Sequence, residues 1–170
     1  WSPDYWNKWY ASLDSHVLAL PKGAKDHLEV GAPPLKTKHG WLLMYSSIKN
    51  YFTPPAVFGI NVALLDSKDP FKIISRINEP ILVPETDYER QGQVPNIVFP
   101  SGAFIRNTSL YLYYGAADTT CCMAVIKTGD LTKILMQPVN RMPLLKRFAN
   151  NPIIQPDGSR AWEAKATFNA

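Results

Sequence analysis

The side chains that could do chemistry in this chain are scattered carboxylates and one lysine, and they form no compact catalytic motif. Lys36 lies at the expected end of a strand, where a compact ammonium group suits an anion. From spacing alone, an exposed structural lysine is the favoured interpretation. Asp118 precedes two threonines in a segment typical of a turn. Its carboxylate could accept hydrogen bonds from neighbouring hydroxyl groups of a ligand or cap the turn, and the sequence leaves both open.

A third candidate, Glu89, lies in the polar segment 85–92, which we expect to be a loop between strands. Acid-rich loops are usually just solvated. A carboxylate in such a segment could instead act as a base that activates water, and Glu89 is our candidate for that role.

The sequence gives no support for metal or thiol chemistry. His16, His27 and His39 lie outside metal-ligand spacings, so that surface or turn positions are expected. Cys121 and Cys122 are adjacent, and neighbours on a strand point to opposite faces. Without CxxC spacing they are expected to be small buried residues rather than a disulfide, a zinc site or a redox pair. We expect neither a metal nor an organic cofactor.

Composition excludes several classes of function. The 170 residues are 46% apolar and 19% charged, with a formal charge of +4. The basic residues are scattered, which argues against nucleic-acid binding. The adjacent pair Lys146–Arg147 is interpreted as a solvated linker. No apolar stretch approaches the roughly 18 residues of a membrane helix, so no membrane partner is expected. The expected lack of a disulfide between Cys121 and Cys122 fits the cytoplasm, where we expect the protein.

One pattern of short segments occurs twice, which indicates an internal duplication. Tyr45 and Tyr114 are equivalent, 69 residues apart, and Ile73 and Ile134 are equivalent, 61 residues apart. A third copy begins near the end, where residues 151–156 echo residues 79–84. The first copy consists of residues 31–37, 41–45, 58–65 and 69–74, and the second of residues 100–105, 110–114, 121–126 and 130–135.

The repeated segments predict strands. They are rich in β-branched and aromatic residues, and 15 Pro and 9 Gly leave little room for long helices. Such a unit cannot bury both faces alone, so copies must pack together. We predict an all-β fold, a β-propeller with about three blades in this chain, since a blade takes about 40 to 50 residues. Residues 1–145 form blades, and residues 146–170 form a linker and the opening strands of a first-blade-like unit.

The segment Gly31–Thr37, followed by Gly40–Tyr45, resembles the G-x-P-P-x-K-T…G-W-L-x-x-Y signature of glycoside hydrolase family 130. Members of that family are five-bladed propellers that phosphorolyse or hydrolyse β-mannosides. Further blocks follow in the family's order at residues 64–70, 79–82, 94–100 and 113–118. Residues 151–154 and 162–170 resemble the opening of the same propeller.

The resemblance implies roles for individual residues. Lys36 matches the lysine that helps to hold inorganic phosphate in the phosphorylases. Tyr45 and Ser46 are further candidate substrate- or phosphate-binding residues, and Ser46 stands where these enzymes commonly carry a phosphate-contacting histidine. Asp118 matches a carboxylate that faces the channel, and Asn169 resembles a first-blade asparagine near the sugar. Because serine brings no positive charge, phosphate affinity should fall, which favours a hydrolytic or differently specific enzyme.

The resemblance implies part of a carbohydrate-active enzyme that cleaves β-mannoside oligosaccharides by inverting phosphorolysis or hydrolysis, with inorganic phosphate as co-substrate in the first case. The catalytic acid resembles an aspartate on a blade that this chain lacks, so we expect the isolated chain to be inactive. The alternative is a non-catalytic carbohydrate-binding or scaffold half-propeller. A propeller for protein partners is a third. Open strand edges predict self-association or pairing with the missing blades.

Overall fold

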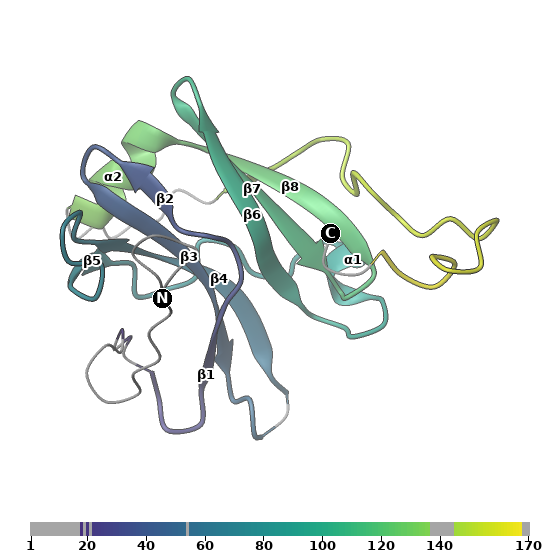
Figure 1. Cartoon of the computed structure of the whole chain (residues 1–170). Helices are drawn as coiled ribbons and strands as arrows, with labels where there is room; N and C mark the ends of the chain where they lie inside the picture. The colour runs from purple at the N-terminus through teal and green to yellow at the C-terminus, as the bar shows by residue number, and fades with distance from the viewer. Residues whose placement is uncertain (1–17, 19, 21, 54, 137–144, 168–170) are drawn as a thin grey trace, which may run out of the picture.

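The computed structural model describes residues 18, 20, 22–53, 55–136 and 145–167, which form two antiparallel sheets (Figure 1). In sheet A the strand order is β1-β3-β4-β5, with β2 also paired to β3, and in sheet B it is β6-β7-β8-β9. Sheet A consists of β1 (His27–Val30), β2 (Leu35–Thr37), β3 (Gly40–Lys49), β4 (Val57–Leu65) and β5 (Ile73–Arg76). Sheet B consists of β6 (Val98–Arg106), β7 (Ser109–Ala116), β8 (Thr120–Lys127) and β9 (Lys146–Arg147).

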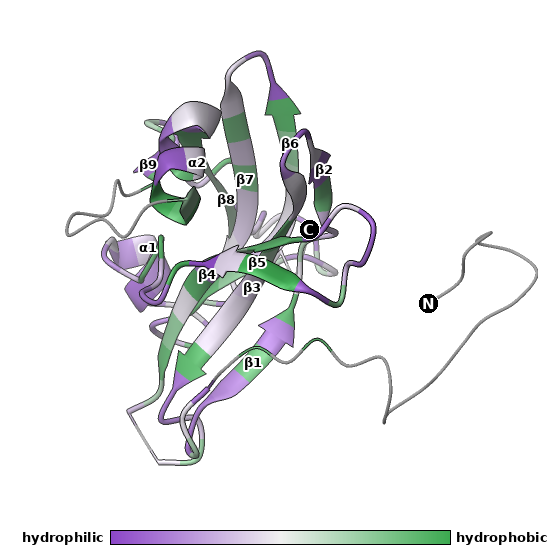
Figure 2. Ribbon diagram, turned by 90° about the vertical axis from the view of Figure 1, so that its left-hand side faces the viewer, coloured by the Kyte–Doolittle hydropathy of each residue, from purple (hydrophilic) through white to green (hydrophobic). Residues whose placement is uncertain are grey.

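Sheet A is buried on both faces, which explains why its central strands are apolar almost without interruption. Along β3, Leu42 and Met44 face sheet B, whereas Leu43 and Tyr45 face the opposite way, towards a cluster that includes Leu20. Figure 2 shows bands of apolar residues on the strands of both sheets.

The main core lies between the two sheets. Met44 and Val62 of sheet A and Leu112 and Tyr114 of sheet B are fully buried in one apolar cluster. Shared burial of this kind is the main favourable contribution to folding, at about 25 cal/mol per Å² of apolar surface. The sheets therefore pack face to face as neighbouring units, and the all-β prediction is confirmed.

Backbone pairing confirms the duplication. A bridge joins Ile60 of β4 to Leu82, and an equivalent bridge joins Cys121 of β8 to Ile154. In each bridge the strand residue donates its N–H to the later carbonyl at 2.9 Å. Residues 79–82 and 151–154, which echo each other in sequence, therefore make the same contact with equivalent strands.

The second copy departs from the first after β8. We expected residues 130–135 to repeat residues 69–74, but Thr128–Met136 forms a helix, α2, beside β5 and β8. Leu131 and Leu135, four residues apart, are buried on the face that packs against the main core. This helical spacing was hidden in a segment too short to show a clear period.

The strand that pairs with β8 comes later, in β9. The interpretation of Lys146–Arg147 as a solvated linker is wrong for Arg147, which faces Ala124 across the β8–β9 pair and is half-buried. The other helix, α1 (Asp87–Arg90), lies in the connection between the two sheets, where a loop was expected.

Candidate functional site

The two sheets meet closely at their first strands. A Cβ on Gly31, just after β1, would overlap the carbonyl oxygen of Pro100 in β6 and crowd the ring of Phe99. Only glycine permits this approach, which explains its place at the start of the repeated segment. The side chains near β1 and β6 are thereby gathered into one region.

Asp118 lies at this junction. It occupies the turn between β7 and β8 with a φ of 48°, a left-handed conformation that Asp tolerates. Together with Glu29 of β1, it lines a pocket of about 190 Å³ whose other walls are Phe58, Ile97 and Phe99. Two carboxylates and two aromatic rings therefore face one small space.

The electrostatics of this pocket are anionic. Burial, and secondly the negative charge of Glu29, raise the pKa of Asp118 above its usual value. The Glu29 side chain is 38% exposed and lies 3.3 Å from His27 Nε2 through its Oε1 atom. Glu29 was missed in the sequence analysis, although its position two residues before Gly31 placed it beside the signature segment.

Ser46 lies close to this junction because its strand, β3, pairs with β1. It lies directly opposite Glu29 in the β1–β3 pair, so the two side chains leave the sheet on the same face. Ser46 is 0% exposed, and within the described part of the chain its hydroxyl has no hydrogen-bond partner. Ser46 thus brings neither charge nor a bonded hydroxyl to this face.

Tyr45 and Lys36 lie elsewhere. Tyr45 faces away from Ser46, and burial raises the pKa of its hydroxyl, an effect that the charge of Arg76 partly offsets. Lys36 is exposed on β2 opposite Trp41, with its Nζ atom 5.3 Å from the centre of the Trp41 ring. Trp41 and Ser46 are five residues apart on β3, about 17 Å at the rise of a strand. The structure does not gather Lys36 and Ser46 into one anion site.

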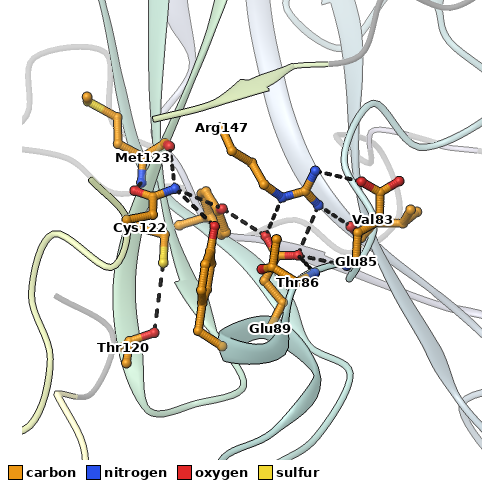
Figure 3. A network of polar contacts seen from close by, with 11 residues as sticks. Val83, Glu85, Thr86, Glu89, Thr120, Cys122, Met123 and Arg147 are labelled. Carbon is orange, nitrogen blue, oxygen red and sulfur yellow. Dashed lines mark hydrogen bonds and ion pairs between the residues drawn. The ribbon is translucent and has the colours of Figure 1, made fainter. Parts of the chain in front are cut away.

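Glu89 forms the densest polar network of the described chain (Figure 3). Its Oε1 atom accepts hydrogen bonds from the Tyr114 hydroxyl and from Arg147 Nε, both at 2.8 Å. Its Oε2 atom accepts from Arg147 Nη2 at 2.9 Å and from the backbone N–H groups of Glu85 and Thr86 at 2.7 and 3.0 Å. Five donors therefore surround one carboxylate.

This environment differs from that of a general base. Burial alone would raise the pKa of Glu89, but the hydrogen bonds, led by those from Arg147, hold the pKa below its usual value. The side chain is 0% exposed and its acceptor positions are filled. A base needs a free lone pair within reach of water. The arrangement instead fits an anchor that joins α1 to β7 and β9.

The two cysteines match their expected role. Cys122 faces the main core, where burial chiefly raises its pKa to about 12. Cys121 lies on the other face, with its sulfur near Thr167. Both are buried thiols.

Among the residues that the structure describes, no cluster of three or more His, Cys, Asp or Glu side chains could hold a metal ion. No helix there has the length and apolar character needed to cross a membrane. Asn169, expected near the sugar, lies outside the described residues, as does His16.

Comparison with known proteins places the chain in a family. Residues 14–137 match the model of glycoside hydrolase family 130, described as β-1,4-mannooligosaccharide phosphorylase. The chain is 50% identical over 98 residues to a β-1,2-mannobiose phosphorylase of Thermoanaerobacter sp. (strain X514), covering 58% of this chain and 31% of that protein. It is 35% identical over 118 residues to a β-1,2-mannobiose phosphorylase of Listeria innocua serovar 6a, covering 68% and 32%. The chain thus spans about a third of the length of these curated relatives.

Solved structures of proteins from the same family resemble the structure of this chain. The Listeria innocua β-1,2-mannobiose phosphorylase, in complex with β-1,2-mannobiose, superposes with a TM-score of 0.58 at 34% identity, over 64% of this chain and 30% of that one. A second structure comes from work describing family 130 glycoside hydrolases that target β-1,2 mannosidic linkages in Candida mannan. It superposes with a TM-score of 0.54 at 29% identity, over 69% and 32%. The two packed sheets are therefore part of a β-propeller, and the chain belongs to glycoside hydrolase family 130.

Proposed function

We propose that this chain supplies part of the sugar-binding site of a larger enzyme that acts on β-mannosides. The observation that carries the proposal is the pocket at the junction of the two sheets, where Asp118 lies beside Glu29. Asp118 is the residue that the family resemblance assigns to the channel. Relatives named as phosphorylases of β-1,2-mannobiose and of β-1,4-mannooligosaccharides support a mannoside as the ligand.

The lining of the pocket suits a sugar. Carboxylate oxygens accept hydrogen bonds from neighbouring hydroxyl groups, and Asp118 and Glu29 offer several acceptor positions. The rings of Phe58 and Phe99 give flat apolar surfaces on which the C–H faces of a sugar pack. A volume of about 190 Å³ is small, and we infer that it holds one sugar unit.

The same pocket disfavours phosphate. Asp118 and Glu29 repel an anion, and Ser46 offers no positive charge to offset them. Lys36, on β2 opposite Trp41, lies far from Ser46 along the sheet. We infer that the parent enzyme uses water, or holds phosphate through residues on other blades. Because this chain spans about a third of its relatives, we also propose that it is inactive alone.

Binding and turnover can be tested separately on the 170-residue chain. We would titrate it with β-1,2-mannobiose, β-1,4-mannobiose and inorganic phosphate, following backbone amides by NMR. The expected result is a sugar-dependent shift at Glu29 and Asp118 that is lost in Asp118→Asn, with no response to phosphate. Asp130→Asn, an exposed carboxylate at the start of α2, is the matched control and should keep the response.

Other outcomes decide between the alternatives. Sugar binding without turnover by the full-length parent would identify a carbohydrate-binding or scaffold propeller. Release of mannose 1-phosphate by the parent would identify a phosphorylase and exclude water as the nucleophile. Binding of phosphate at Asp118 as well would contradict the second alternative, in which residues on other blades hold the phosphate. No response to either sugar would overturn the proposed site.

A further inference from the structure

Arg76 and Arg147 occupy equivalent positions in the two sheets. Arg76 lies opposite Ala63 in the β4–β5 pair, and Arg147 lies opposite Ala124 in the β8–β9 pair. The two alanines are equivalent, since they lie three residues after the equivalent bridged residues Ile60 and Cys121 of β4 and β8. Each arginine is thus carried by the last strand of its sheet.

Each arginine also lies near one of two equivalent tyrosines, Tyr45 on β3 or Tyr114 on β7. Tyr114 shares the carboxylate of Glu89 with Arg147. Tyr45 lies opposite Asn61, as Tyr114 lies opposite Cys122, and the charge of Arg76 acts on its hydroxyl. The two sheets therefore present the same pair of side chains, a tyrosine and an arginine, on equivalent faces. In sheet A this face points away from sheet B, and in sheet B it points towards sheet A.

The partners of the two arginines differ. The guanidinium of Arg147 is held by Glu85, by Glu89 and by the carbonyl of Val83 at 2.7 to 2.9 Å. Within the described part of the chain, the Arg76 side chain makes no hydrogen bond or ion pair, although the residue is half-buried. A partly desolvated guanidinium without a partner is costly, so this position favours an acceptor.

A space for that acceptor exists. Arg76, Tyr45 and Asn61 line a pocket of about 230 Å³, the Arg76 pocket, on the face of sheet A that points away from sheet B. In sheet B the corresponding space is filled by the carboxylate of Glu89, on the segment that leads into that sheet.

The other charged groups of the Arg76 pocket leave it cationic. They are Lys22, Asp26 and Lys49. Asp26 already accepts hydrogen bonds from the backbone N–H groups of Gly23 and Asn50. Lys49 is paired with Glu79 at 3.2 Å, so Arg76 and Lys22 remain without a described carboxylate partner.

We propose that the Arg76 pocket is a docking site for an acidic side chain, aspartate or glutamate, on a protein segment that packs against the outer face of sheet A. The segment would enter as α1 enters against sheet B, and its carboxylate would accept from Arg76 and from the Tyr45 hydroxyl. Arginine binds carboxylates in two parallel hydrogen bonds, which gives such a contact a defined orientation. The pocket thereby joins this chain to the neighbouring blade of the assembled ring.

The test uses a probe copied from the occupied site. A peptide with the sequence of residues 84–92 is added to the ¹⁵N-labelled chain, and the Arg76 Nε–Hε resonance is followed by NMR. We expect a saturable shift, and binding at least about tenfold weaker for the peptide that carries Glu85→Gln and Glu89→Gln, since a hydrogen bond to an ionised carboxylate is about twice as strong as one to a neutral amide. This comparison needs no change to the folded chain.

Variants of the chain locate the effect. Arg76→Met should abolish the difference between the two peptides, whereas Arg106→Met, at an exposed arginine of β6, should keep it. Equal binding of the two peptides, or an unmoved Arg76 resonance, would overturn the proposal. An equal shift of that resonance with inorganic phosphate would also overturn it, because the site would then be a general anion site.

Discussion

Glu89 in α1 binds Arg147 in β9 through two hydrogen bonds of 2.8 and 2.9 Å, although the residues are 58 positions apart in sequence. The contact joins the segment that leads into sheet B to the last strand of that sheet. Because the Glu89 side chain is 0% exposed, its charge depends on this partner in place of water. The attachment of β9 to sheet B and the charge of the Glu89 carboxylate are therefore coupled.

Arg147→Met should strongly destabilise the fold. Removing one member of a buried ion pair leaves the other charge uncompensated, at a cost of about 3 to 5 kcal/mol. Equilibrium unfolding in urea would measure the loss. The matched control is Lys146→Met, at the exposed neighbour of Arg147 on β9, which should change the free energy of unfolding by less than about 0.5 kcal/mol. Equal losses in the two variants would contradict a role for the network.

Glu89→Gln should flatten the dependence of stability on pH. The folded pKa of Glu89 is lowered, so its charge stabilises the fold fully above the unfolded pKa of about 4.3 and progressively less as pH falls through the folded pKa. The unsubstituted 170-residue chain should therefore lose stability more steeply than the Glu89→Gln variant below about pH 4.3. The urea midpoint measured from pH 7 to pH 3 would show this. Glu79→Gln, at an exposed glutamate outside the network, should show the same pH dependence as the unsubstituted chain. An unchanged pH dependence in Glu89→Gln would disprove that the folded pKa of Glu89 is lowered.

The sequence predicted the repeated parts of the fold well, because their signal is local. Tyr45 and Tyr114 lie on equivalent strands, and the short echo at residues 151–154 makes the bridge that its first copy makes. Helix α2 was missed because only two buried leucines mark its period. Here the duplication misled the prediction, since equivalent sequence positions had diverged into different structures.

The sequence singled out Asp118, which lies in a pocket at the junction, but not its neighbour Glu29. A contact between Asp118 and a sugar stays a prediction. The roles of Glu89 and Arg147 depend on each other across two sheet connections, and no local pattern reveals such a pair. Polar residues in a loop and in a linker look solvated until the partner's position is known.

Gly31→Ala should separate the two sheets at the junction. The added methyl group would overlap the Pro100 carbonyl, and backbone atoms yield less readily than side chains. Overpacking of this kind costs about 1 to 3 kcal/mol, and the loss should appear as a lower thermal midpoint. Gly102→Ala, on β6, is the matched control because nothing lies within 4 Å of the added carbon. A Gly31→Ala chain as stable as the control would show that the junction can adjust.

Ser46→Ala should stabilise the chain, in contrast to Ser47→Ala. The Ser46 hydroxyl is buried without a partner in the described structure, so deleting it should add about 1 kcal/mol to the free energy of unfolding. The Ser47 hydroxyl donates to Asn61 Oδ1 at 2.5 Å, so deleting it should cost about 1 kcal/mol. Urea unfolding of both variants measures the two signs. A destabilised Ser46→Ala chain would mean that the hydroxyl has a partner in solution, and Ser46 would then regain a claim to bind a ligand.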